Sequence, residues 1–405
     1  MAECPTDLIN EMFLRLRATT LVKCRVLSKP CFSLIDSPEF VSSHLRRRLE
    51  TGEHLMILLR GPRLLRTVEL DSPENVSDIP HPLQAGGFTE VFGSFNGVIG
   101  LCNSPVDLAI FNPSTRKIHR LPIEPIDFPE RDITREYVFY GLGYDSVGDD
   151  FKVVRIVQCK LKEGKKKFPC PVEVKVFSLK KNSWKRVCLM FEFQILWISY
   201  YYHLLPRRGY GVVVNNHLHW ILPRRQGVIA FNAIIKYDLA SDDIGVLSFP
   251  QELYIEDNMD IGVLDGCVCL MCYDEYSHVD VWVLKEYEDY KSWTKLYRVP
   301  KPESVESVEF IRPLICSKDR SKILLEINNA ANLMWFDLES QSLTTAGIEC
   351  DSSFTADILV SSLVLGCKGD PTQAQRRKDQ MGWFSVQGIQ AEAMSKARES
   401  SEPKH

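Results

Sequence analysis

The sequence predicts a small all-α segment followed by a large all-β domain, a β-propeller of about six four-stranded blades. Two observations predict this fold class. Apolar residues recur at helical spacing in the first 48 residues, whereas short β-branched and aromatic runs separated by turn residues follow. A unit of four such runs then repeats five times, which is typical of blades that stack on their neighbours. A two-sheet β-sandwich is the alternative architecture.

The helical segment contains three or four short helices. Pro30 and the run Ser37-Pro38-Glu39 are typical of helix starts, because proline is tolerated in a first turn. So short a segment buries too little surface to offset its ordering entropy alone, and we expect much of its apolar surface to contact a partner. The first helix is predicted from apolar residues at i, i+1, i+4, i+5 and i+8: Leu8, Ile9, Met12, Phe13 and Leu16.

The order of residues in this segment resembles the plant F-box motif. The matching stretches are Pro5, Asp7-Leu8-Ile9, Leu14-Arg15-Leu16, Leu21-Val22-Lys23-Cys24-Arg25, Leu27-Ser28-Lys29 and Ser33-Leu34-Ile35. The resemblance implies docking on a Skp-type adaptor, and through it on a cullin and a RING protein. The residues that it implies for adaptor contact are Pro5, Leu8, Ile9, Leu14, Leu16, Leu21, Cys24, Val26, Leu27 and Ser28. The sequence departs from the motif at Arg17, where proline is usual, and at Cys31, where tryptophan is usual.

The β repeats begin near Val91. Each has two hairpins, and their third strands align on one aromatic position: Phe111, Phe177, Tyr237, Trp282 and Phe336. Asn96-Gly97 is the strongest hairpin-turn signal among them. The segments His54–Leu70 and Thr355–Leu365 supply strands from the two ends of the chain. We expect these ends to share one blade and close the ring, which would remove free sheet edges.

Three stretches of the β region resemble the F-box-associated interaction domain of plant F-box (F-box/kelch-like) proteins: GLGYD at 141–145, FNPSTRKIHRLP at 111–122 and FSLKKNSWKR at 177–186. The predicted organisation is therefore an F-box at 1–48, a propeller-like target-binding domain at 49–368 and a disordered polar tail at 369–405. Such a chain would be non-catalytic, because its part is to hold a target near a ubiquitin-charged enzyme.

Composition limits the other functions. The 405 residues carry a net charge of -4, which argues against a nucleic-acid binder, and the thirteen cysteines have no disulfide-framework spacing, which indicates a reducing compartment. The run 189–205 approaches membrane-span length, but its Glu192, Gln194 and His203 make a membrane span unfavourable. If one loop binds the target, we expect this aromatic insertion, with candidate residues Trp197, Tyr200, Tyr201, Tyr202, Arg207 and Arg208.

The sequence contains no pattern typical of a catalytic or metal-binding site. Cys267, Cys269 and Cys272 could suggest zinc, but two of them alternate on one strand and only His278 lies near, so small core thiols are the simpler interpretation. Nucleophile–base sets and glycine-rich phosphate loops are absent from the sequence. We therefore expect no metal, cofactor or catalytic residue. The competing hypothesis of a propeller enzyme predicts a cluster of titratable side chains at one mouth of the channel.

The sequence as a whole resembles F-box proteins that restrain plant immunity. The resemblance implies nucleotide-binding leucine-rich-repeat immune receptors as targets, degradation by the proteasome, and a place in cytoplasm and nucleus. A scaffold that only sequesters its target is the alternative if Arg17 and Cys31 prevent adaptor docking.

Overall fold

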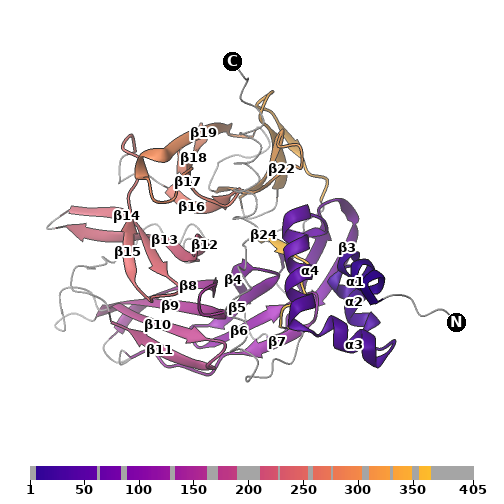
Figure 1. Ribbon diagram of the computed structural model, residues 1–405. Coiled ribbons are helices and arrows are strands. Elements are labelled where there is room, and N and C mark those ends of the chain that lie inside the picture. The colour runs from indigo at the N-terminus through magenta and orange to yellow at the C-terminus, as the bar shows by residue number, and fades with distance from the viewer. Residues whose placement is uncertain are drawn as a thin grey trace, which may run out of the picture.

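The computed structural model describes residues 6–61, 64–83, 89–127, 133–161, 172–188, 210–226, 229–253, 259–274, 277–302, 310–328, 332–348 and 355–365. These residues form four α-helices followed by six four-stranded antiparallel sheets arranged in a ring (Figure 1). The prediction of an all-α segment followed by a six-bladed propeller is confirmed, and the sandwich alternative is wrong. The predicted tail, 369–405, and the aromatic insertion lie outside the described residues.

The helices are α1 (Thr6–Arg15), α2 (Ala18–Cys24), α3 (Lys29–Ile35) and α4 (Pro38–Thr51). The side chain of Ser28 accepts a hydrogen bond from the first turn of α3, and that of Ser37 does so for α4. Pro30 and Pro38 each occupy the first turn that follows such a cap, as predicted. No helix in the described ranges is both long and apolar enough to cross a membrane.

Each blade is a meander whose first strand is innermost. The first blade contains β24 (Thr355–Val360), β1 (Leu55–Arg60), β2 (Leu64–Glu69) and β3 (Ser72–Pro80). The second contains β4 (Glu90–Phe95), β5 (Val98–Ser104), β6 (Asp107–Asn112) and β7 (Lys117–Arg120). The third contains β8 (Ile133–Asp145), β9 (Asp150–Leu161), β10 (Val172–Ser178) and β11 (Ser183–Val187).

The remaining three blades repeat this order. The fourth contains β12 (Val212–Val214), β13 (His217–Gln226), β14 (Ile229–Asp238) and β15 (Ile244–Leu247). The fifth contains β16 (Met259–Leu264), β17 (Cys267–Tyr273), β18 (His278–Leu284) and β19 (Trp293–Pro300), with a 3-10 turn, η2 (Tyr290–Ser292), before β19. The sixth contains β20 (Ile311–Cys316), β21 (Lys322–Ile327), β22 (Asn332–Asp337) and β23 (Leu343–Thr345).

The two ends of the chain close the ring in the first blade. Strand β24 pairs with β1 in antiparallel register from Leu55↔Val360 to Arg60↔Thr355. The innermost strands contact one another in the order β24, β4, β8, β12, β16, β20 and back to β24. The predicted sharing of a blade by the two chain ends is therefore confirmed. The sequence did not predict the outermost strand of this blade, β3.

The predicted alignment of the third strands on one aromatic position is correct in the second, third, fourth and sixth blades and is displaced by one residue in the fifth blade. Phe111, Phe177, Tyr237 and Phe336 are each the penultimate residue of their strand and are buried. In β18 the penultimate residue is Val283, which is buried, whereas Trp282 is partly exposed. The pairing with β19 is irregular at the same place, because the partner changes from Tyr297 opposite Val281 to Lys295 opposite Trp282. The alignment on Trp282 was therefore one residue out.

The turn between β6 and β7 holds the chain segment that follows β24. The side-chain amide of Asn112 is fully buried and donates to the carbonyls of Ser362 (3.1 Å) and Val364 (2.6 Å). Its oxygen accepts from the backbone N–H groups of Ser114 (2.8 Å) and Thr115 (3.1 Å). One side chain therefore shapes the Asn-Pro-Ser-Thr turn and fixes the segment 361–364 against it.

The helices and the propeller share one hydrophobic core. A single cluster of buried side chains includes Leu21 and Leu45 from the helices, Leu59 and Phe92 from the first two blades, and Leu363 from the segment after β24. Separating the helices from the blades would expose this apolar surface to water, which is unfavourable. The helical segment is therefore packed against the propeller.

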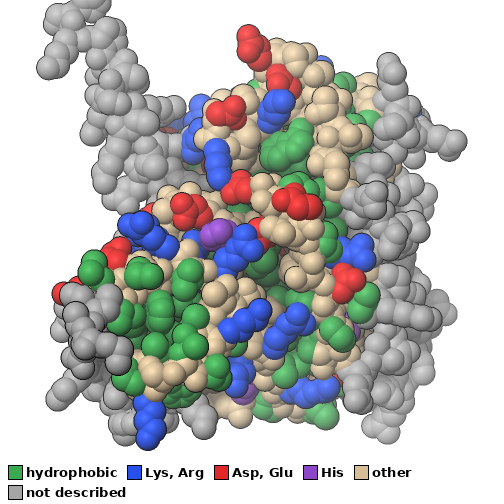
Figure 2. Space-filling model, turned by 90° about the vertical axis from the view of Figure 1, so that its right-hand side faces the viewer, with side chains coloured by type: hydrophobic (Ala, Val, Ile, Leu, Met, Phe, Trp, Pro, Cys, Tyr) green, Lys and Arg blue, Asp and Glu red, His purple; other side chains and the backbone are tan. Residues whose placement is uncertain are grey.

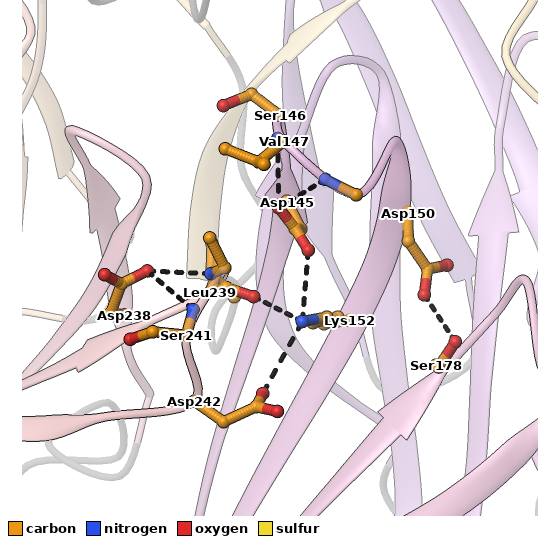
Figure 3. A network of polar contacts seen from close by, with 12 residues as sticks. Asp145, Ser146, Val147, Asp150, Lys152, Ser178, Asp238, Leu239, Ser241 and Asp242 are labelled. Atoms are coloured by element: carbon orange, nitrogen blue, oxygen red, sulfur yellow. Dashed lines mark hydrogen bonds and ion pairs between the residues drawn. The ribbon is translucent and has the colours of Figure 1, made fainter. Parts of the chain in front are cut away.

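Charged side chains link neighbouring blades, most clearly between the third and fourth (Figure 3). The ammonium group of Lys152 lies 3.1 Å from Oδ2 of Asp145 and 3.5 Å from Oδ1 of Asp242, and it donates to the carbonyl of Leu239. Lys152 is on β9, whereas Leu239 and Asp242 follow β14. Because this ammonium group is largely buried and has partners on both blades, it fixes one blade against the next.

Candidate functional site

The helical segment presents an exposed apolar patch. Five of the thirteen large hydrophobic side chains that are exposed in the described residues belong to it, although it is a small part of the chain. On the face that carries the helices, hydrophobic side chains gather with Lys and Arg side chains beside them (Figure 2). Exposed apolar surface of this kind is typical of a protein contact. We name as the docking patch Leu8, Met12, Val26, Leu27 and Phe32.

Nine of the ten residues predicted to contact an adaptor are described, and they divide into three groups. Leu8, Val26, Leu27 and Ser28 are exposed; Ile9, Leu16 and Cys24 are partly buried; Leu14 and Leu21 are buried in the shared core; and Pro5 lies outside the described residues. In this chain Leu14 and Leu21 therefore support the helices from within. The structure also exposes Met12 and Phe32, which were not among the predicted contacts, although Met12 stood in the predicted apolar stripe.

Two buried side chains of α4 hold the end of α1 in place. Nε2 of His44 lies 2.8 Å from the carbonyl of Leu16, and Nη2 of Arg48 donates to the same carbonyl at 2.6 Å. Carbonyls at a helix C-terminus have no partner within the helix, so these contacts satisfy one of them. Burial lowers the pKa of His44 to about 4, and the positive charge of Arg48 acts in the same direction. His44 is therefore neutral near pH 7.

Arg17 joins the helical segment to the first blade. Its Nη2 lies 2.8 Å from Oε2 of Glu69, at the end of β2, and its Nε donates to Nδ1 of His54 at 3.4 Å. Burial lowers the pKa of His54, and the charges of Arg48 and Arg17 lower it further. A proline at position 17, as the F-box motif usually has, could make neither contact. The departure at Arg17 therefore adds an ion pair between the two parts.

The two faces of the ring differ in their connections. Where the inner strands end, tight turns join successive strands, and several use residues with positive φ: Asn96, Asp149, Asn182, Asn215, Asp242 and Asp265. We call this the turn face. The helices join the propeller at the turn face, because α4 leads into the start of β1. The start of β1 pairs with the end of the inner strand β24, where the turns lie. We call the opposite face, where blades are joined to one another, the loop face.

A buried ion cluster fixes one connection on the loop face. Arg155 and Glu173 are fully buried and lie 3.0 Å apart, and Nη1 of Arg155 also donates to the carbonyl of Glu124 at 2.6 Å. The ammonium group of Lys175 lies 2.6 Å from both Glu124 and Asp127. Residues 121–127, which follow β7, are thus held against the third blade by charge-assisted hydrogen bonds.

A second cluster of titratable groups lies between the first and sixth blades. Arg312 on β20 lies 2.9 Å from Glu326 on β21 and 3.4 Å from Asp357 on β24. Glu326 accepts the backbone N–H of Ala356 at 3.1 Å, and Arg312 donates to the carbonyl of Ala356. An inner strand has unpaired backbone groups on its free edge. These two side chains therefore pair with the backbone N–H and carbonyl of Ala356 on the free edge of β24 and join the last blade to it.

The remaining predicted positions carry no further site geometry. Cys269 and Cys272 are buried, Cys267 is partly buried, and Sγ of Cys269 lies 3.8 Å from Sδ of Met271. Across the described parts of the chain, no three His, Cys, Asp or Glu side chains are placed to share a metal ion. The predicted target contacts between Trp197 and Arg208 lie outside the described residues.

The chain is similar to known F-box proteins over most of its length. Residues 87–358 match the family described as the F-box associated beta propeller domain. The chain is 57% identical over 386 residues to F-box protein CPR1 of Arabidopsis thaliana, covering 94% of this chain and 93% of that protein. It is 24% identical over 348 residues to an F-box/kelch-repeat protein of the same plant, covering 81% of this chain and 86% of that protein.

These similarities, with the helical segment and six-bladed ring, define the class of protein as an F-box protein with a propeller. The chain belongs to the family of plant F-box proteins that carry an F-box associated beta propeller domain.

Proposed function

We propose that this chain is the substrate-recognition subunit of an SCF (Skp–cullin–F-box) ubiquitin ligase. The observation that carries the proposal is the exposed docking patch on a helical segment that resembles an F-box. The patch would bind a Skp-type adaptor, which joins the chain to a cullin and a RING protein. The chain's own contribution would be proximity, because a bound target is held at high effective concentration near the ubiquitin-charged enzyme.

The propeller would hold the target on its loop face. The helices belong to the turn face, so a target on the loop face would leave the docking patch free for the adaptor. The ion cluster of Arg155, Glu173 and Lys175 gives that face a fixed element, since it holds residues 121–127 in place. The target would therefore meet an ordered surface beside the longer connections.

For the target itself, we propose nucleotide-binding leucine-rich-repeat immune receptors, as the resemblance of the sequence to F-box proteins that restrain plant immunity implies. Their ubiquitination and proteasomal degradation would make the chain a negative regulator of plant defence, acting in cytoplasm and nucleus. The chain itself would be non-catalytic. The Arg312–Glu326 pair, which the enzyme hypothesis could use as a titratable cluster, instead bonds the backbone of β24.

The test is adaptor binding by the full-length chain, measured by calorimetry with a purified plant Skp-type adaptor. The variant combines Leu8→Ala, Val26→Ala and Leu27→Ala, all exposed positions whose truncation leaves the shared core intact. Losing a fully buried Leu side chain from an interface costs roughly 2 kcal/mol, so the variant should bind at least about a hundredfold more weakly.

The matched control is Val147→Ala together with Ile123→Ala, which removes exposed apolar side chains from the propeller. The control should bind the adaptor as the unmodified chain does. Absence of adaptor binding by the unmodified chain would refute the ligase role and favour a sequestering scaffold. Equal binding by variant and control would refute the docking patch as the contact surface.

A further inference from the structure

A pocket lies where the helical segment meets the first and second blades. Its volume is about 230 Å³, and we call it the junction pocket. Arg17 and Thr19 line it from the helical segment, His54 and Glu69 from the first blade, and Ser114 and Arg116 from the turn between β6 and β7. Three parts of the fold that are distant in sequence therefore contribute side chains to one small cavity.

The charged groups of the junction pocket favour an anion. Arg17 and Arg116 are the two guanidinium groups of its lining, and Glu69 is the one carboxylate. That carboxylate is already engaged, because Oε2 of Glu69 accepts from Arg17 at 2.8 Å and from Nδ2 of Asn75 at 3.2 Å. The Nδ1 atom of His54 accepts from Arg17, so its Nε2 carries the proton and is a donor. One positive charge is left in excess.

Arg116 supplies that excess charge. It has no hydrogen-bond or ion-pair partner among the described residues, although it lines a pocket that contains a carboxylate. Its backbone has a φ of 58°, a left-handed conformation that is uncommon for arginine. Asn112 holds the turn that precedes Arg116, because its side chain accepts the N–H groups of Ser114 and Thr115. The turn thus fixes the position from which this guanidinium group extends.

We propose that the junction pocket binds a small oxyanion, the phosphate or carboxylate group of a free small molecule, between Arg17 and Arg116. The planar guanidinium group suits both oxyanions, because it donates parallel hydrogen bonds to two oxygens. The hydroxyl groups of Thr19 and Ser114 add donors to the lining. At about 230 Å³ the pocket is smaller than typical sites for drug-sized ligands, so a compact anionic group fits it best.

Such a ligand would also strengthen the junction between the two parts of the chain. It would contact Arg17 in the helical segment and Arg116 in the second blade, which no described hydrogen bond connects directly. Because a ligand that binds only the folded state stabilises it, the melting temperature should rise with ligand concentration. This inference is independent of the proposed ligase role.

The experiment is titration of the full-length chain with inorganic phosphate, glycerol phosphate and acetate at constant ionic strength, with chloride as the balancing anion. Binding is measured by calorimetry and melting temperature. The variant is Arg116→Gln, at an exposed position. The matched control is Arg120→Gln, which removes an exposed arginine from β7, outside the pocket lining.

The unmodified chain and the Arg120→Gln control should bind at least one of these anions saturably, and Arg116→Gln should bind it about tenfold more weakly. Arg116→Lys should recover part of the loss, because it restores the charge without the planar geometry. Three results would overturn the proposal: no saturable binding of any of these anions below about 10 mM, equal binding by Arg116→Gln, or binding only of a phosphoserine peptide that is titrated in parallel.

Discussion

Replacing Asn112 with alanine should release the segment that follows β24. The fully buried side chain of Asn112 bonds two backbone carbonyls and two backbone N–H groups. A buried hydrogen bond contributes about 1 kcal/mol net, and a buried group left unpaired costs about 1–3 kcal/mol. In the variant, the four backbone groups would lose their protein partner, and some of them would bond to water instead. We therefore expect the free energy of unfolding to fall by about 3–5 kcal/mol.

The assay is urea denaturation followed by tryptophan fluorescence, together with hydrogen exchange at residues 361–364. Asn112→Asp separates the two halves of the contact, because a carboxylate keeps the acceptor for Ser114 and Thr115 but cannot donate to Ser362 and Val364. It should lose exchange protection at 361–364 yet keep it in the turn. The control Asn75→Ala removes a single exposed hydrogen bond and should change stability by less than about 1 kcal/mol.

The reasoning is refuted if Asn112→Ala lowers the free energy of unfolding by no more than the Asn75→Ala control does. It is refuted equally if residues 361–364 keep full exchange protection in Asn112→Ala. Either result would mean that the segment is held by the burial of Leu363 in the shared core and that the hydrogen bonds to Asn112 add little.

Two further predictions concern buried charge. The pKa of His44 is about 4 in the folded chain and near 6.5 in the unfolded chain, so between these pH values the unfolded state binds more protons than the folded state. The free energy of unfolding should therefore keep its full value above about pH 6.5 and fall by about 3 kcal/mol towards pH 4. His44→Gln should reduce that fall in denaturation curves measured across this range, and an unchanged pH dependence would contradict the assignment. Glu173→Gln leaves the buried Arg155 without its carboxylate and should lower the free energy of unfolding, measured by urea denaturation, by about 3 kcal/mol. Hydrogen exchange at residues 121–127 should increase as well. An exchange rate equal to that of the unmodified chain would show that the ion cluster does not hold this connection.

Much of the fold followed from local pattern. The repeated strands and turn residues defined the blades, and the unpaired strands at the two ends predicted the ring closure by β24 and β1. Strand β3 was missed because Ser72–Pro80 is polar and contains two prolines, and most of its residues are exposed. Pairing with β2, a tertiary contact, makes it a strand despite its low intrinsic preference.

The docking patch was only partly predictable for a related reason. Helical spacing shows which residues share a face, but it does not show which face packs on a neighbouring domain. Leu14 and Leu21 look like Leu8 and Leu27 in sequence, yet the first pair is buried and the second exposed. The two pairs differ in their packing against α4 and the propeller. Arg48 of α4 contributes to this packing by contacting the carbonyls of Leu14 and Leu16, which lie more than thirty positions earlier in the chain.

Closure of the ring by β24 also orders events during synthesis. The helices and β1 leave the ribosome first, but the inner neighbour of β1 is made near the end of the described chain. Until then, the blade beside the helices lacks its innermost strand, and the edge of β1 is open to other strands. A product of premature termination would carry the helices on an incomplete blade, with an exposed edge that protein quality control can recognise.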